Sequence, residues 1–250
     1  MVFPARVSGP WTREKLIYVS KYAGAFMTSM APKRTAQKWV EFVYIDPSFD
    51  RLFFSDLSNR NVDALRRRIS PSDLNRVTLQ SGDCNEVAKR VVKALPTRSL
   101  GLAFIDPEGF EVAFSLFEIL STRRIDVLFL FPSGIGIRRN LAKFARRAHS
   151  PMDRLWGDRS WRELPPAKLA AGRRLDSDEA LSLDRPWVLA FRTKMAGLGF
   201  IYQDEADPCF TNEKNVPMYH LLFFSKHPAG LTLWRGIKKI SPSGQRLLPF

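Results

Sequence analysis

Short apolar runs alternate with longer amphipathic stretches along residues 41–136. The runs are rich in Val, Ile, Leu and Phe and end at polar or turn-forming residues, as buried strands do. They read FVYI (42–45), LFF (52–54), RVTLQ (76–80), LGLAFI (100–105) and VLFLF (127–131). Between them, apolar residues recur at helical spacing in segments that begin near Ser58, near Val87 and near residue 111. Strands alternating with helices predict an α/β fold, with a Rossmann-like, mostly parallel sheet and helices on both faces.

The first part of the chain predicts one long helix over residues 11–30. Thr12 can cap it, and Ala31–Thr35 (APKRT) is expected to end it. The residues expected on its buried face are Leu16, Val19, Ala23, Phe26 and Met30.

The pattern changes after Gly136. Residues 137–149 (IRRNLAKFARRAH) predict an amphipathic helix, with basic side chains on the faces away from its apolar residues Ile137, Leu141 and Phe144. Residues 150–185 are rich in proline and arginine, and we expect them to be irregular around a helical segment at 165–172.

The last part of the chain predicts a helix over 186–198 followed by a hairpin. Two apolar runs, GFIYQ (199–203) and MYHLLFF (218–224), are joined by a polar loop and predict a C-terminal antiparallel β-hairpin. Without an internal repeat, the chain is expected to form a single domain, 1–250. Its parts are the N-terminal helix (11–30), the core of strand–helix units (41–136), a basic helical or irregular insertion (137–198), and the hairpin with its tail (199–240).

Charge adds a preference for anionic partners. The chain carries 39 Lys and Arg against 25 Asp and Glu, a formal net charge of +14. Such an excess favours polyanions such as nucleic acids through long-range attraction and counterion release. The alternative is a solvated basic surface with no partner, because net charge alone does not define a groove.

Several kinds of site find no support in the sequence. Cys84 and Cys209 lie far apart without CxxC spacing, which argues against a disulfide scaffold and fits a reducing cytosol. The histidines lack metal-ligand spacing, so no metal is expected. SGIG (133–136) lacks GxGxxG spacing and favours a turn. The N-terminus does not resemble a signal peptide and the apolar runs are too short for a membrane span, so we expect a cytoplasmic protein.

Aspartates follow the predicted strands at one edge of the sheet. In open α/β sheets, ligands bind at the carboxyl ends of the strands. Asp46, Asp56, Asp83 and Asp106 each stand at such an end. Each could merely cap a helix or form a turn. Because all four fall at the same edge, their arrangement favours an ancestral nucleotide site.

The order of these elements resembles class I methyltransferases that use S-adenosylmethionine. The details are similar to one family, the three-Cys-motif partner proteins (TcmP). The motifs that carry this likeness run through most of the chain: WTREKL, YAGAF, VYID, FFSDLSNRNVDALRRRI, SGDCNEV, FIDPEGFEV, IDVLFLFPSGIGIRRNL, LWGDRSW and MYHLLFFSKHPAGLTLW. The resemblance implies a seven-stranded Rossmann-like sheet, a presumed methyltransferase activity, and association with a three-cysteine-motif, radical-SAM-like protein.

The resemblance also implies roles for particular residues. Asp46 would end the first strand, and Asp56 would accept hydrogen bonds from the cofactor ribose. Asp83 and Asn85, in SGDCN, would lie beside the adenine. Asp106 and Pro107 would form the catalytic corner after the fourth strand. Here that corner reads DPEGF, so Glu108 and Gly109 replace the proline and aromatic residue of amino-methyltransferases.

The stretch EFVYIDPSFDRLFFSDLS (41–58) departs most from the family. The family has a glycine-rich turn and a helix between the first two strands, whereas here only PSFD separates Asp46 from RLFF. A parallel crossover needs about a dozen residues or more. Two arrangements remain open: FVYI pairs antiparallel with RLFF through a Pro47–Asp50 turn, or FVYI keeps its usual place and the link is strained.

Three functional interpretations follow. The first is an S-adenosylmethionine-dependent methyltransferase of the TcmP type. The second is a methyltransferase-like fold that has lost its cofactor and acts as a partner subunit or nucleic-acid-binding module, because the glycine turn is absent. The third is a deletion or gene-model error between Asp46 and Phe49, which resequencing would expose.

Overall fold

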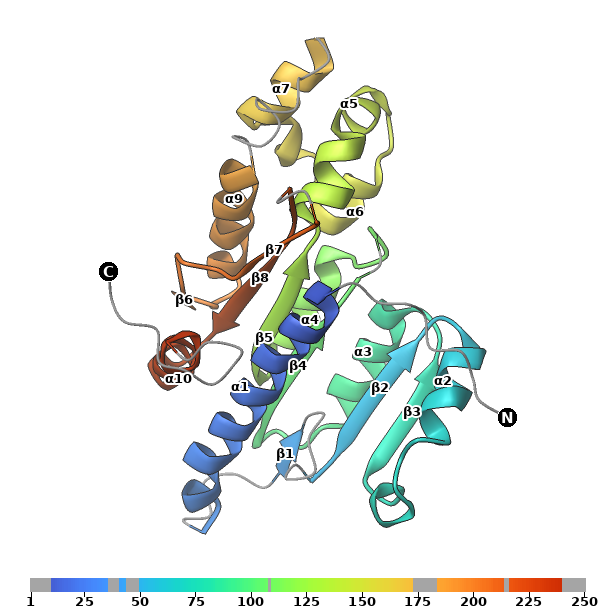
Figure 1. The fold of residues 1–250 in the computed structure, drawn as a ribbon, viewed down its shortest axis with the longest axis vertical. Coiled ribbons are helices and arrows are strands. Elements are labelled where there is room, and N and C mark those ends of the chain that lie inside the picture. The colour runs from blue at the N-terminus through green and yellow to red at the C-terminus, as the bar shows by residue number, and fades with distance from the viewer. Residues whose placement is uncertain are drawn as a thin grey trace.

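The computed structural model describes residues 10–35, 41–43, 50–107, 109–172, 184–213 and 216–239. They form an α/β fold with a six-stranded mixed sheet, a two-stranded parallel sheet and helices on both faces of the larger sheet (Figure 1). The predicted fold class is therefore confirmed.

The larger sheet has the strand order β1-β4-β5-β8-β6, and β7 also pairs with β8. Its first three strands are mutually parallel, and β8 is antiparallel to β5. Strands β6 and β7 pair with opposite ends of β8, which makes the predicted C-terminal hairpin. The strands are β1 (Glu41–Val43), β2 (Leu52–Asp56), β3 (Val77–Ser81), β4 (Ser99–Ile105), β5 (Arg124–Phe131), β6 (Tyr202–Gln203), β7 (Cys209–Thr211) and β8 (Pro217–Ser225).

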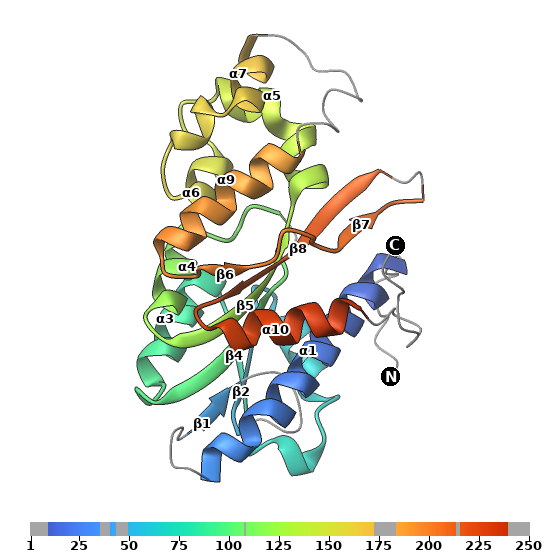
Figure 2. The same cartoon turned by 90° about the vertical axis from the view of Figure 1, so that its left-hand side faces the viewer.

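Two layers of helices cover this sheet. Figure 2 shows α1 and α10 together on one face, with α3, α4 and α9 on the other. The helices are α1 (Pro10–Thr35), α2 (Asn59–Arg66), α3 (Cys84–Ala94), α4 (Phe114–Ser121), α5 (Arg139–Arg146), α6 (Pro151–Trp156), α7 (Pro165–Gly172), α9 (Asp184–Gly197) and α10 (Pro228–Lys238). Short 3₁₀ turns, η1 (Pro71–Asp73) and η3 (Ser160–Glu163), and a π-helical turn, η2 (Ser133–Arg138), connect them.

Alternation along β5 divides the core between the two faces. Side chains in a strand point alternately to opposite sides. Val127, Phe129 and Phe131 accordingly join the cluster under α4 and α9, whereas Leu128 and Leu130 join the cluster under α1 and α10. All five side chains are fully buried. This explains why the run is apolar at every position.

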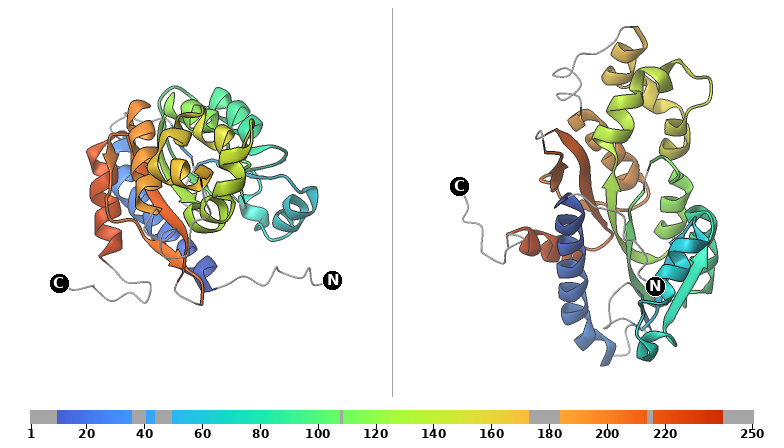
Figure 3. Two further views of the ribbon diagram at one scale, coloured as in Figure 1. Left: turned by 90° about the horizontal axis from the view of Figure 1, so that it is seen from above. Right: turned by 45° about the vertical axis from the view of Figure 1, so that its right-hand side comes forward.

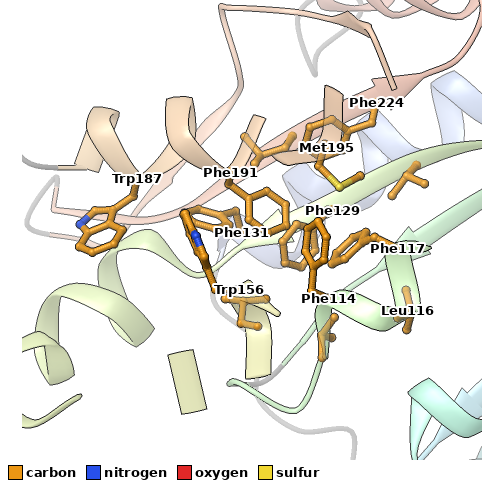
Figure 4. Packing of buried hydrophobic residues seen from close by; sticks show 14 of the residues in the cluster. Phe114, Leu116, Phe117, Phe129, Phe131, Trp156, Trp187, Phe191, Met195 and Phe224 are labelled. Carbon is orange, nitrogen blue, oxygen red and sulfur yellow. The ribbon is translucent and has the colours of Figure 1, made fainter. Parts of the chain in front are cut away.

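Phe191 of α9 is at the centre of the larger cluster (Figure 4). Its ring centroid lies 5.4 Å from that of Phe129, 5.2 Å from that of Phe131 and 5.7 Å from that of Trp156. Edge-to-face and tilted contacts at this range contribute beyond the area they bury. The long helix α9 is therefore held to the sheet mainly by aromatic packing.

Strands β1 and β2 are consecutive along the chain but belong to different sheets. Among the described residues, β1 pairs only with β4 and β2 pairs only with β3, both in parallel. The antiparallel pairing of FVYI with RLFF is thus not found in the described part of the chain, and Glu41–Val43 keep the usual place beside β4. The continuous seven-stranded sheet implied by the resemblance is instead divided, and Figure 3 shows the β2–β3 pair to one side.

Helix α1 differs from its prediction at both ends. It begins at Pro10, so Thr12 lies inside it, and it continues through Pro32 to Thr35 although APKRT was expected to end it. A proline removes one helical hydrogen bond, which the helix tolerates here close to its end. Leu16 is 49% exposed and Lys15 takes the buried position instead. The other residues of the predicted face, Val19, Ala23, Phe26 and Met30, are buried.

Two regions contain more structure than expected. Residues 150–164, expected to be irregular, form α6 and η3. Ser150 caps α6 in a capping box with Asp153, and Gly157 ends it in the left-handed conformation. The predicted tail contains α10, whose N-cap is the imidazole of His227, with Pro228 at its first position.

One polar pair is enclosed on the α1 face of the sheet. The hydroxyl of Tyr22, a fully buried residue, donates a hydrogen bond of 2.6 Å to Oδ2 of Asp126. Burial raises the pKa of Asp126 to about 6, although hydrogen bonds from Ser225 and Tyr22 oppose the rise. The carboxyl also lies against Gly230, where an added Cβ would come within 2.9 Å of Oδ2. Helices α1 and α10 therefore meet over a carboxyl group that depends on its hydrogen bonds.

We expect Phe191→Ala to lower the free energy of unfolding by about 3–5 kcal/mol, because it opens a cavity among several rings. Urea denaturation followed by circular dichroism measures this. Leu189→Ala, on the same helix at a 48% exposed position, is the matched control and should change stability by less than about 0.5 kcal/mol. Equal losses in the two variants would contradict the central place given to Phe191.

We expect Tyr22→Phe to destabilise the protein more at pH 7.5 than at pH 5. The folded pKa of Asp126 is above its unfolded value, so the stability that this carboxyl provides is lost as pH rises toward about 6. Removing the phenol raises that pKa further and costs about 1–3 kcal/mol when the carboxylate is charged. Tyr18→Phe is the control, and a loss that is independent of pH would refute the prediction.

Candidate functional site

The candidate site is the edge of the sheets at the carboxyl ends of β2, β3 and β4. Asp56 is the last residue of β2, Asp83 follows β3 and caps α3, and Asp106 follows β4. Asp46, the fourth predicted site residue, lies outside the described residues. Each of the other three carboxylates has a different set of partners, and these partners decide what each can do.

The Asp56 carboxylate is exposed and held by hydrogen bonds alone. The Ser58 amide donates to Oδ1 at 2.7 Å, and the Asn61 side-chain amide donates to both oxygens at 3.1 and 3.0 Å. Among the described residues, no Lys or Arg forms an ion pair with it. The carboxylate is thus oriented by its own loop and keeps acceptor capacity toward solvent, as a group that receives hydroxyl donors requires.

Asp83 is occupied by α3 and by a cation. Its Oδ1 accepts hydrogen bonds from the backbone amide of Asn85 at 2.8 Å and from its side-chain amide at 2.5 Å. Its Oδ2 pairs with Arg154 of α6 at 2.8 Å. Burial acts to raise the pKa of Asp83, but these hydrogen bonds and the Arg154 charge outweigh it and lower the pKa. The group is therefore ionised and structurally engaged.

Asn85 joins α3 to the segment after β4. It is buried, its side-chain amide also donates to the Glu111 carbonyl at 3.0 Å, and its side-chain oxygen accepts from the Ala113 amide at 2.8 Å. Both amide hydrogens are thus used within the protein. A role of Asn85 at an adenine remains a prediction, while its observed bonds position residues 111–113.

Asp106 is paired with a lysine that the sequence pattern did not identify. Lys15 of α1 donates to Oδ2 of Asp106 at 2.5 Å, with the lysine side chain 7% exposed and the aspartate 37% exposed. Pro107 is buried, and Glu108 lies outside the described residues. At the predicted catalytic corner, the negative charge of Asp106 is therefore paired with the positive charge of Lys15.

The sequence did contain a signal for Lys15. It stands at helical spacing before Val19, Ala23 and Phe26, so it occupies a position on the apolar face of α1. A charged residue there predicts a buried partner, because an unpaired buried charge is costly. Arg154 had no comparable signal, because α6 itself was not predicted.

The SGIG segment is used for packing. It lies in the π-helical turn η2 and not in a simple turn as expected. A Cβ on Gly134 would lie 1.9 Å from the carbonyl oxygen of Pro217, and one on Gly136 would lie 2.9 Å from the Phe110 ring. Both positions require glycine because β8 and the segment after β4 approach so closely.

Other chemistry finds little support at this edge. Burial, with the carboxylates of Asp83 and Glu111, raises the pKa of the Cys84 thiol, so it remains protonated. The part of the chain that the structure describes contains no group of three or more His, Cys, Asp and Glu that could hold a metal ion. Nδ1 of His220 and the hydroxyl of the buried Ser133 form a hydrogen bond of 2.8 Å. Burial lowers the pKa of His220 to about 4.

Comparisons with known proteins add one structural likeness. No family model matches the chain, and no curated protein matches it. Three chains of solved structures match, among them the methyltransferase domain of bacterial CtHen1-CN, at a TM-score of 0.34 and 8% sequence identity. That match covers 82% of this chain and 99% of the other. A likeness at this level establishes neither a cofactor nor an activity.

The hydropathy of the described helices was compared with that of membrane-spanning helices. No helix within the described ranges has both the length and the apolar character needed to cross a bilayer.

We expect Asn85→Ala to lower the free energy of unfolding by about 1–3 kcal/mol, because the Ala113 amide and Glu111 carbonyl lose their partner. It should also make the chain at residues 111–113 more sensitive to limited proteolysis. Asn59→Ala, at an exposed position, is the control and should change stability by less than about 0.5 kcal/mol. Unchanged stability and proteolysis in Asn85→Ala would show that the segment is held by other contacts.

Proposed function

We propose that the chain is a methyltransferase-like protein of the three-Cys-motif partner type that holds the ribose of S-adenosylmethionine at Asp56. The observation that carries this proposal is the state of the Asp56 carboxylate, which is oriented, exposed and without a cation among the described residues. In nucleotide-binding α/β folds, an acidic residue at this strand end accepts hydrogen bonds from ribose hydroxyls.

The remaining residues fit the cofactor in part. Leu57, next to Asp56, is 79% exposed and offers an apolar surface of the kind that a base covers. Asp83 has one oxygen bound to Arg154 and the other bound to Asn85, so its capacity to meet an adenine amine is reduced. When bound, S-adenosylmethionine supplies an activated methyl group on a sulfonium. The chain's own contribution at Asp56 is to orient the nucleoside.

A second candidate function is favoured by the ion pair of Lys15 and Asp106. A carboxylate at this corner that is to hold an acceptor amine needs free oxygens, and here one is paired with a lysine that is almost buried. This supports a protein that binds the cofactor nucleoside, or has lost it, and acts as a partner subunit without transferring methyl groups.

Calorimetry with S-adenosylmethionine and its demethylated product tests the first proposal. We expect binding by the wild type and a loss of about 10- to 100-fold in affinity for Asp56→Asn, because hydrogen bonds to a charged acceptor contribute about 1.5–3 kcal/mol. Asp63→Asn, at an exposed position on the neighbouring helix, is the control and should bind as the wild type does. Absence of heat at millimolar ligand would end the proposal.

Two further measurements separate the candidate functions. Binding without methyl transfer to nucleic acid or protein acceptors would favour the partner role, and co-purification with a three-cysteine-motif protein would support it. If methyl transfer is detected in the wild type, the ion pair of Lys15 and Asp106 does not prevent catalysis and the second candidate is wrong.

A further inference from the structure

The exposed face of α5 carries a row of cations (the α5 row) that form no ion pair with the residues that the structure describes. Arg139, Lys143 and Arg146 are spaced four and three residues apart, which places them on one side of the helix, and Arg147 follows directly. All four are exposed, and among the described residues none of them forms an ion pair. Helix α5 contains no acidic residue.

The described carboxylates between the start of α5 and the end of α7 form ion pairs with other cations. Between the start of α5 and the end of α7, the acidic residues are Asp153, Asp158 and Glu163. Asp153 pairs with Arg162 and Arg159, Asp158 with Lys194 of α9, and Glu163 with Lys168. Hydrogen bonds from Lys194 and Ser160 outweigh burial and lower the pKa of Asp158, so it stays ionised and committed. Within the described residues, no carboxylate of this segment offsets the charge on α5.

Arg162 anchors the carboxyl end of α5 to the protein. Its guanidinium donates hydrogen bonds to the carbonyls of Ala145 and Arg147, each at 2.8 Å, at the carboxyl end of the helix. It also lies 4.6 Å from the ring centroid of the buried Trp161. Leu141 and Phe144 bury the opposite side of α5 in the core. The cationic row therefore stands on a rigid element, which reduces the entropy lost when a ligand binds.

Helix stability does not account for this row. Cations near a helix carboxyl end interact favourably with the helix dipole, which can explain Lys143 and Arg146. Arg139 follows η2 directly and stands away from the carboxyl end, where the dipole stabilises cations. The dipole therefore does not account for Arg139.

We propose that the α5 row (Arg139, Lys143, Arg146 and Arg147) binds the phosphate backbone of a nucleic acid. The cations follow the helix at a rise of about 5.4 Å per turn, so successive side chains can each reach a phosphate along a strand. Phosphate contacts of this kind give affinity without sequence preference. The proposal does not depend on binding of S-adenosylmethionine.

A nucleic acid fits this surface better than an anionic membrane. Helices that lie on membranes insert apolar side chains beside their cations. Here the large apolar side chains of α5, Leu141 and Phe144, are buried against the protein, so only charge is offered outward. Figure 1 shows α5 at the end of the molecule beyond the carboxyl end of β5, where a long strand can approach it.

Fluorescence anisotropy tests the proposal with labelled single strands of RNA and DNA of about 20 nucleotides, which span an ordinary single-strand site. We expect Arg139→Ala/Lys143→Ala/Arg146→Ala to weaken binding by about 10- to 100-fold and to reduce the slope of log affinity against log salt by about 2. A duplex of the same sequence distinguishes single-strand from duplex binding.

A variant of equal charge change separates the row from net charge. Arg60→Ala/Arg66→Ala/Arg68→Ala removes three exposed cations around α2, away from α5 (Figure 1), and should lower affinity by less than threefold. Circular dichroism and thermal unfolding verify that both variants fold. The proposal is overturned if the wild type binds none of these nucleic acids, if both variants lose affinity equally, or if only anionic lipid vesicles are bound.

Discussion

The pairing of β5 with β8 is the contact on which the rest of the structure depends. Val127 through Phe131 lie opposite Phe224 through His220, and nearly every side chain in this ladder is fully buried. One set of alternate side chains builds the aromatic cluster with α9, and the other builds the cluster with α1 and α10. The strand that ends in this ladder continues into η2 and α5, so the core directly positions the carboxyl edge and the cationic row.

The carboxyl edge is held together by polar contacts of long sequence separation. Lys15 reaches Asp106 from α1, Arg154 reaches Asp83 from α6, and Asn85 reaches the segment after β4. Among Asp56, Asp83 and Asp106, the three described aspartates of this edge, only Asp56 forms no ion pair with a described Lys or Arg. The hydrogen bonds and ion pairs of this edge are thus made largely within the protein.

Local patterns in the sequence predicted most strands, because alternation and apolar runs are properties of neighbouring residues. The strands at 100–105 and 127–131, the helix beginning near Ser58 and the C-terminal hairpin are all present. Helix α6 was missed because proline and arginine content outweighed the capping box of Ser150 and Asp153. The partner of FVYI could not be decided locally, since it depends on β4, more than fifty residues later. Arg154 was missed because α6, the helix that carries it, was not predicted.

The division between the two sheets has a consequence for local motion. Within the described residues, β2 and β3 share backbone hydrogen bonds only with each other, so side chains such as Leu52 and Phe53 attach this pair to the larger body. Units attached by few contacts open independently of the global unfolding of a protein. Amide protons of β2 and β3 should therefore exchange with solvent sooner than those of β5. Asp56 is the last residue of β2, so a ligand bound at its carboxylate would slow the local opening of the β2–β3 pair.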